Sequence, residues 1–242
     1  MAQKYYIGTS GWNYDHWKYN FYPESIARKD WFEYYTGHFD TVEINYSFYR
    51  WPDQDTVKLW AGNAPSGFIY TMKAPRLITH FKRLKDAAGK VSDFYNLTSL
   101  LKDHAGCHLF QLRPDFKNNE NNFSRLEQFL ESLDKRKNNA VEFRHSSWWS
   151  EEVYQLMDSN KTAFCTVVGL GMPGRVIVTG GTAYFRFHGD EYAGSYSDSE
   201  LEEWAKQMKN LECRKLYAYF NNDAEGYAPA NALKLKEALG DK

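Results

Sequence analysis

The chain alternates between short apolar segments with a two-residue period and longer segments with a helical period. Phe68–Lys73 is a short run rich in β-branched and aromatic residues that ends just before Pro75, which is typical of a strand. Phe123–Lys137 has instead the 3.6-residue period of an amphipathic helix. Its apolar stripe consists of Leu126, Phe129, Leu130 and Leu133.

The two patterns predict eight strands and seven helices in alternation. We expect strands in Tyr5–Ser10, in the first part of Asp40–Arg50, and in Phe68–Lys73, Cys107–Leu112, Ala140–Phe143, Ala163–Val168, Thr182–Phe187 and Leu216–Phe220. We expect helices at Arg28–Tyr35, Asp53–Ala61, Leu84–Asp103, Phe123–Lys137, Glu151–Ser159, Ser199–Leu211 and Ala230–Leu239. Either Ser197 or Ser199 is expected to cap the helix at Ser199–Leu211.

Eight strands separated mostly by helices predict an α/β fold, a (β/α)8 TIM-type barrel that forms one domain over residues 1–242. An open doubly wound sheet is the weaker alternative, because no GxGxxG fingerprint follows the first strand. The connection between the sixth and seventh strands is short and carries Gly169, Gly171 and Gly174. We therefore expect the barrel to be irregular there, without a helix.

Polar side chains gather where three of the predicted strands end. In Asp40–Arg50, the apolar residues Val42 and Ile44 alternate with Glu43 and Asn45, so the two pairs face opposite sides of the strand. The same construction returns in residues 141–144 and 185–188. Since catalytic groups of this fold lie at the carboxyl ends of the strands, we expect these side chains to converge at the mouth of the barrel.

The candidate catalytic residues are Glu43, Glu142 and His188. Two carboxylates can form an acid/base pair as in glycoside hydrolysis, but neighbouring cations lower carboxyl pKa values and favour the role of a base or stabiliser. His188 is a candidate proton shuttle near neutral pH. The competing interpretation is a buried ion network that fills the barrel, with His188 as a structural residue.

The candidate substrate-binding residues combine cations, amides and aromatic rings. They are Trp12, Tyr14, Asn45, Tyr49, Arg50, Lys73, Gln111, Arg144, Arg186, Asn221 and Asn222. The surplus of Arg and Lys indicates an anionic ligand, because a guanidinium matches phosphate or carboxylate. The aromatic rings could stack on a base or a sugar. For any single ring, packing at the rim is the simpler explanation.

Composition and charge limit the classes of binding partner and the cellular location that we expect. The net charge is −1, which excludes a global basic field for nucleic acid or an acidic membrane. No segment is apolar and long enough for a signal peptide or a membrane span. The three cysteines are odd in number and share no ligand spacing. We therefore expect a cytoplasmic protein, with a small anionic substrate or a nucleic acid as its partner and no membrane.

No cofactor is predicted. The densest metal-like run, His104–His108, belongs to the start of the fourth strand and hence to the far end of the barrel. Better ligand types occur near the mouth, at Glu43, Glu142, His145, His188 and Asp190. Cations are interleaved with them and oppose a dication, so ligand spacing does not support a divalent metal. The glycine loop 169–174 lacks the lysine of a phosphate-binding loop.

Several motifs together carry a resemblance to a known family. They are Gly8–Trp12 with Tyr14 and Trp17, Phe21–Pro23, Val42–Asn45 with Ser47–Arg50, Val141–His145 with Trp148, Arg186–Gly189, and Tyr219–Asp223 with Asn231 and Ala232. In these motifs the chain resembles the YecE-like family, domain of unknown function 72, nearly from end to end. The resemblance implies a TIM-type barrel in a bacterial or archaeal cytoplasm and no established reaction.

Two departures from that family pattern bear on activity. Arg113 stands before Pro114 where relatives tend to read Gln-Leu-Pro-Pro, which adds a cation. Relatives often carry an acid after the sixth strand, whereas Val168 here runs into Gly169. If that acid is essential in relatives, this chain has an altered activity.

The residues favour an enzyme, of a hydrolase or phosphoesterase-like type, that acts on an anionic, phosphate-bearing substrate such as part of a nucleic acid. A non-catalytic nucleic-acid-binding protein is the first alternative. A carbohydrate-active hydrolase is the second, and it requires two carboxylates about 5–9.5 Å apart. A purely structural barrel remains the simplest alternative.

Overall fold

The structure is a computed structural model that describes residues 3–240. Within them, eight parallel strands form one sheet in the order β1-β8-β7-β6-β5-β4-β3-β2. The strands are β1 (Lys4–Thr9), β2 (Thr41–Ile44), β3 (Ile69–Lys73), β4 (Ala105–Gln111), β5 (Asn138–Glu142), β6 (Thr162–Gly169), β7 (Thr182–Gly189) and β8 (Lys215–Phe220). The predicted (β/α)8 barrel is confirmed.

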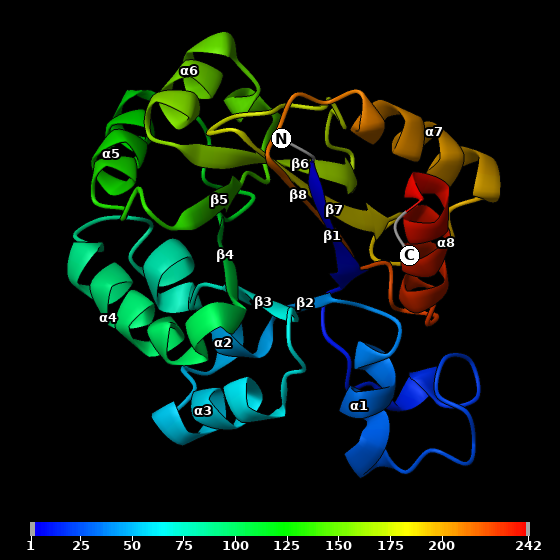
Figure 1. Cartoon of the computed structure of the whole chain (residues 1–242). Helices are drawn as coiled ribbons and strands as arrows, with labels where there is room; N and C mark the ends of the chain where they lie inside the picture. The colour runs from blue at the N-terminus through cyan, green and yellow to red at the C-terminus, as the bar shows by residue number, and fades with distance from the viewer. Residues whose placement is uncertain (1–2, 241–242) are drawn as a thin grey trace.

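Helices surround the strands. They are α1 (Trp31–Thr36), α2 (Tyr46–Tyr49), α3 (Gln54–Asn63), α4 (Ala88–Thr98), α5 (Glu120–Glu131), α6 (Glu151–Ser159), α7 (Asp198–Lys209) and α8 (Ala228–Leu239). Figure 1 shows α3 to α6 along one side of the strands and α7 and α8 on the other. In the described part of the chain, no helix is both long and apolar enough to span a membrane.

The expected irregularity between the sixth and seventh strands is confirmed, because residues 170–181 hold no helix. The β6–β7 register shifts at Val168 and Gly169. Gly169 has a φ of +95°, and a β-carbon there would lie 2.1 Å from the carbonyl oxygen of Gly189. Only glycine fits this close approach of the two strand ends.

Several predicted boundaries were wrong. The helix expected at Phe123–Lys137 runs from Glu120 to Glu131, because the side chain of Asn119 caps its first turn by accepting from the backbone N–H of Asn122. The region Leu84–Asp103 is split, since α4 ends at Thr98 and a 3-10 turn follows in Ser99–His104.

The segment Asp40–Arg50 is also divided. Its strand ends at Ile44, and the short helix α2 follows. Ser197, and not Ser199, caps α7: its hydroxyl accepts from the backbone N–H of Glu200 in a capping box.

Side-chain alternation gives the barrel an inner and an outer core. The outer faces of the strands join the helices in one large apolar cluster. The inner faces form a smaller cluster that contains four tyrosines, namely Tyr6, Tyr184, Tyr217 and Tyr219. The hydroxyl of Tyr219 lies 2.7 Å from Thr41 Oγ1 and 2.8 Å from Thr71 Oγ1, so its polar group is satisfied inside the barrel.

The junction between β1 and β2 closes the barrel without a ladder. No backbone hydrogen bond joins these two strands in the described chain. The hydroxyl of Tyr35, from α1, bridges them instead. It accepts from the Thr9 backbone N–H at 3.2 Å and donates to the Thr41 carbonyl oxygen at 3.0 Å.

We expect Tyr35→Phe to lower the free energy of unfolding by about 1–3 kcal/mol, because it leaves the Thr9 N–H and the Thr41 carbonyl without partners. Urea denaturation followed by circular dichroism measures the change. Tyr34→Phe is the matched control on the same helix, since the Tyr34 hydroxyl has no hydrogen bond to a described residue, and it should stay within about 0.5 kcal/mol of the parent protein. Equal effects from the two substitutions would show that the bridge contributes nothing.

Candidate functional site at the C-terminal mouth of the barrel

The carboxyl ends of the strands bring the predicted charged residues together. In each strand, the side chain of every second residue points into the barrel. Near the carboxyl ends of the strands, these inward-pointing side chains are polar. The inward polar residues at this end are Ser10, Glu43, Lys73, Gln111, Glu142, Arg186, His188 and Asn221. The convergence expected from the sequence is therefore present, and hydrogen bonds connect most of its members.

Arg186 lies at the centre of this group. Its Nη1 donates to Glu142 Oε2 and its Nη2 donates to Glu43 Oε1, each at 2.6 Å. The side chain is only 1% exposed, and both carboxylates are fully buried. One guanidinium thus separates the two candidate catalytic acids, and each of its terminal nitrogens already binds one carboxylate.

Glu43 has further partners. Its Oε1 accepts from the Ser10 hydroxyl at 2.7 Å, and its Oε2 accepts from the Tyr184 hydroxyl at 2.6 Å. Sequence reasoning missed Tyr184. The available signal was spacing, because Tyr184 precedes Arg186 by two residues on the same strand and must share its inward face.

Glu142 is held between two guanidinium groups. Its Oε1 accepts from Arg144 Nε, in addition to the contact with Arg186. Burial by itself would raise the pKa of Glu142, but Arg144 and Arg186 hold this pKa well below its ordinary value. Glu142 is therefore an ionised carboxylate near neutral pH, which suits a base and excludes a proton donor.

His188 is fully buried beside this pair. Its Nε2 lies 3.3 Å from Arg144 Nη2 and its Nδ1 lies 3.2 Å from Asn221 Nδ2. Burial lowers the pKa of His188 to about 3. Because Arg can only donate, the neutral imidazole accepts from it at Nε2. We therefore expect His188 to position Arg144, and not to carry a proton to a substrate.

Lys73 differs from the other charges. Its side chain is nearly buried, and Nζ lies 4.1 Å from the ring centroid of Phe48 in α2. It has no hydrogen bond or ion pair with any described residue. Burial, reinforced by Arg186, lowers the pKa of Lys73 to about 7 despite the acids nearby. The two acids balance the two arginines, so Lys73 is the cation left over.

An aromatic hollow of about 420 Å³ lies beside this network, between the loop after β1 and the segments that follow β2. Its lining includes the predicted Trp12, Tyr14, Asn45 and Tyr49, together with Tyr46 and Trp60. The Tyr14 hydroxyl donates to the Ser10 carbonyl oxygen at 2.6 Å, which ties the hollow to the network.

The remaining predicted residues lie outside the network. Arg50 is exposed at the end of α2. Gln111 is next to Glu142 in the β4–β5 register but makes no side-chain hydrogen bond within the described chain. Asn222 is buried away from the mouth, where it donates to the Gly194 carbonyl and to Asn231 Oδ1.

The additional cation expected from the family comparison, Arg113, is paired with Asp115 through two nitrogen atoms. Within residues 3–240, no three His, Cys, Asp or Glu side chains are grouped so that they could hold a metal ion.

Comparison with known proteins gives a family match over nearly the whole chain. The family described as "Protein of unknown function DUF72" matches residues 6–242. The UPF0759 protein YunF of Bacillus subtilis is 27% identical over 97% of this chain and 94% of its own length. The UPF0759 protein YecE of Escherichia coli K12 is 29% identical over 60% of this chain and 50% of its own length.

Solved structures of the same family have the same fold. A DUF72 family protein from Thermotoga maritima is 31% identical, with a TM-score of 0.89 over 98% of this chain and all of the other. A second one, from Enterococcus faecalis, shares the fold at 19% identity, with a TM-score of 0.83 over 98% of this chain and 95% of the other.

The buried histidine predicts how stability responds to acid. Folded His188 stays neutral down to a pKa of about 3, whereas an unfolded histidine titrates near about 6.5. Between these values the unfolded chain binds the extra proton, so His188 is expected to lower the free energy of unfolding by about 1.4 kcal/mol for each pH unit below about 6.5. His108, with a pKa lowered to about 4 by burial, acts in the same direction.

Urea denaturation across this pH range measures the slope. His188→Gln keeps an acceptor for Arg144 and should flatten the slope by the equivalent of one proton. An unchanged slope in this variant would show that His188 is charged in the folded protein.

Proposed function

The chain belongs to the DUF72 family of proteins of unknown function, and from the geometry of its mouth we propose that it is an enzyme acting on a small anionic, phosphate-bearing substrate. The observation that carries the proposal is the unpaired ammonium of Lys73, buried against Phe48 at the end of β3. Catalytic sites of this fold lie at this end of the barrel.

A buried cation without a partner is costly, and folded proteins usually pair or neutralise such a group. The other charges near Lys73 are already paired with one another through Arg186 and Arg144. An anionic group of a substrate would supply the missing partner. Lysine binds phosphate as a compact point charge, so a phosphoryl oxygen at Nζ is the simplest ligand.

The same arrangement assigns roles to the neighbouring residues. The ammonium of Lys73 would neutralise charge that develops on the phosphoryl group in the transition state. Glu142, kept ionised by two arginines, is the candidate base, and Glu43 is fixed on the opposite side of Arg186. The adjoining aromatic hollow offers a surface for the apolar part of the substrate.

Neither alternative gains support from these contacts. In a two-carboxylate glycosidase the scissile bond lies between the acids, whereas here the guanidinium of Arg186 occupies that position. A nucleic-acid binder needs free cations along the backbone path, and Arg144 and Arg186 are both neutralised by Glu142 and Glu43.

Lys73→Met tests the anion site. Sulfate is a suitable probe because its charge is constant over the pH range of interest. Affinity for sulfate, measured by titration calorimetry, should fall by up to about tenfold for each pH unit above about 7, because the protonated amine is the binding form. Lys73→Met should remove the sulfate binding that weakens above about pH 7, and it should raise the free energy of unfolding at neutral pH by about 1 kcal/mol, since it removes a buried polar group.

Lys58→Met, on the exposed face of α3, is the matched control and should leave both quantities unchanged. A sulfate stoichiometry and pH dependence that are the same in Lys73→Met and in the parent protein would remove the proposed anion site.

Turnover of a panel of phosphate mono- and diesters tests the enzymatic part. We expect at least one class to be hydrolysed, and Lys73→Met should lower kcat/KM by about 10²–10³-fold, as for loss of one transition-state donor. Sulfate binding without turnover of any ester would separate an anion-binding protein from a phosphoesterase.

A further inference from the structure

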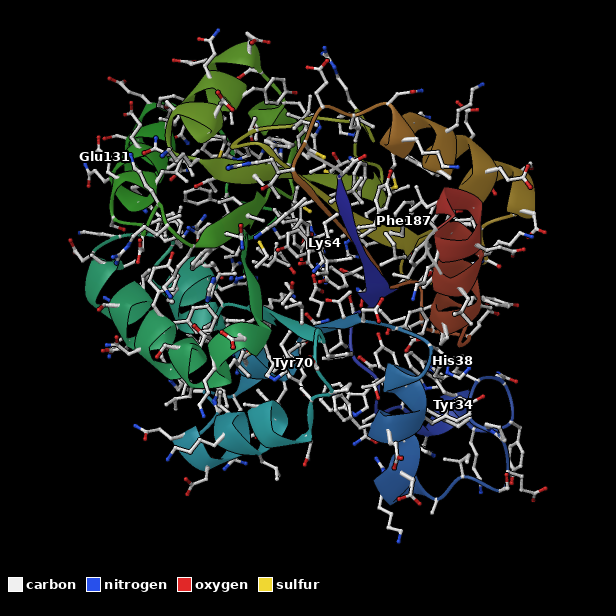
Figure 2. All side chains as sticks on the ribbon, viewed as in Figure 1. Lys4, Tyr34, His38, Tyr70, Glu131 and Phe187 are labelled. Atoms are coloured by element: carbon white, nitrogen blue, oxygen red, sulfur yellow. The ribbon has the colours of Figure 1, made fainter. Side chains whose placement is uncertain are left out.

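A second hollow, of about 540 Å³, lies at the opposite end of the barrel. Its lining comes from the first residues of the strands and includes Lys4 of β1, Lys215 of β8 and Asn138 of β5. Because all strands are parallel, this is the amino-terminal end, remote from the mouth described above. Figure 2 labels Lys4 beside β1, inside the ring of helices, whereas Glu131 of α5 lies at the outer edge.

Two lysines lie side by side in the lining of this hollow. Lys4 and Lys215 are register partners on adjacent strands, and like charges directly opposite each other are destabilising. Neither lysine forms an ion pair with a described residue. Lys215 Nζ only donates to Asn138 Oδ1 at 3.3 Å, and Lys4 Nζ lies 5.0 Å from the ring centroid of Tyr6. The repulsion between the two ammonium groups is therefore uncompensated by the protein itself.

Two phenol hydroxyls in the lining also lack partners. The rings of Tyr6 and Tyr217 are stacked with centroids 4.8 Å apart, and the residues are only 6% and 1% exposed. Neither hydroxyl has a hydrogen bond to a described residue. The hydroxyls of the other two tyrosines inside the barrel, Tyr184 and Tyr219, are all bonded. Both hydroxyl oxygens keep some contact with solvent, so they open into the hollow and are accessible to a ligand there.

An ammonium group only donates and a phenol hydroxyl can donate, so the two lysines and the two tyrosines can all donate to one ligand. We propose that the amino-terminal hollow is a binding site for a small oxyanion of phosphate type. Lys4 and Lys215 supply the opposing charge, and the hydroxyls of Tyr6 and Tyr217 donate hydrogen bonds from the floor. This site is independent of the function proposed for the mouth.

Other groups in the lining limit where the anion lies. Asp103 is an exposed carboxylate on the rim and would repel an anion beside it. The neighbouring His104 is fixed by a 2.8 Å hydrogen bond between Nδ1 and the Phe68 carbonyl oxygen. The anion is therefore expected on the side of Lys4 and Lys215.

The test is titration of inorganic phosphate into the Lys73→Met protein, in which the mouth site is removed. Calorimetry should still show one phosphate per chain. Adding Lys215→Gln should weaken binding at least about tenfold, as for loss of a charge-assisted hydrogen bond. Adding Tyr217→Phe, which keeps the stacked ring and removes only the hydroxyl, should weaken it by a smaller factor of about fivefold. Phosphate should raise the Tm of Lys73→Met and shift it less in both double variants.

The Tm of each variant without phosphate shows whether it is folded. Absence of phosphate binding to Lys73→Met would overturn the proposal, as would equal affinity in the two double variants and their parent. Because Lys73→Met has no mouth site, neither result depends on whether the mouth binds anions. A parallel titration with citrate identifies the class of anion. Tighter binding of phosphate than of citrate supports a site for a tetrahedral oxyanion, and tighter binding of citrate contradicts it.

Discussion

The rest of the mouth depends on one guanidinium shared by two carboxylates. Arg186 of β7 binds Glu142 of β5 and Glu43 of β2, and all three side chains are withdrawn from water. Charges in this position are tolerated only when every one of them is matched, and removing one partner of such a pair typically costs about 3–5 kcal/mol. The pairing therefore fixes three strands relative to one another and leaves little electrostatic freedom in the centre of the mouth. Lys73 is the one nearby cation of the described chain that this network does not pair, which is why it is the candidate binding group.

Both ends of the barrel contain hydrogen-bond donors that no described residue pairs, but the surrounding residues differ. At the carboxyl end, one amine is left without a partner among balanced charges. At the amino end, two amines without an ion pair and two hydroxyls without a hydrogen bond to a described residue line the hollow. Unsatisfied donors that are largely removed from water are uncommon in folded proteins, because each one forfeits its hydrogen bonds to water. The unpaired donors at the amino end differ from such atoms because they border a hollow from which a ligand can reach them, and the aromatic hollow lies beside the network at the mouth.

The hydrophobic periodicity of the sequence was sufficient to predict the barrel and to predict which side chains of each strand point inward. Alternation around Glu43 and Glu142 correctly placed both acids inside the mouth, because the side-chain period of a strand does not depend on its neighbours. The same pattern could not reveal that Arg186 joins the acids, since partners are set by the closure of strands far apart in the chain. For this reason Arg186 was expected to hold a substrate and His188 to shuttle protons, whereas one braces the acids and the other accepts from Arg144. The position of Asn222 could not be predicted either, because its hydrogen bonds go to Gly194 and Asn231, which lie in other segments of the chain.

The junction between β1 and β2 has a mechanical consequence. Backbone hydrogen bonds join seven of the eight pairs of neighbouring strands, whereas side chains join the eighth pair, through the Tyr35 hydroxyl of α1 and the hydrogen bond from Ser10 to Glu43. The strand along this weak junction, β1, begins at Lys4 in one hollow and leads into Ser10 in the other. β1 therefore runs from one opening to the other with a backbone ladder on one side only, the one that it forms with β8.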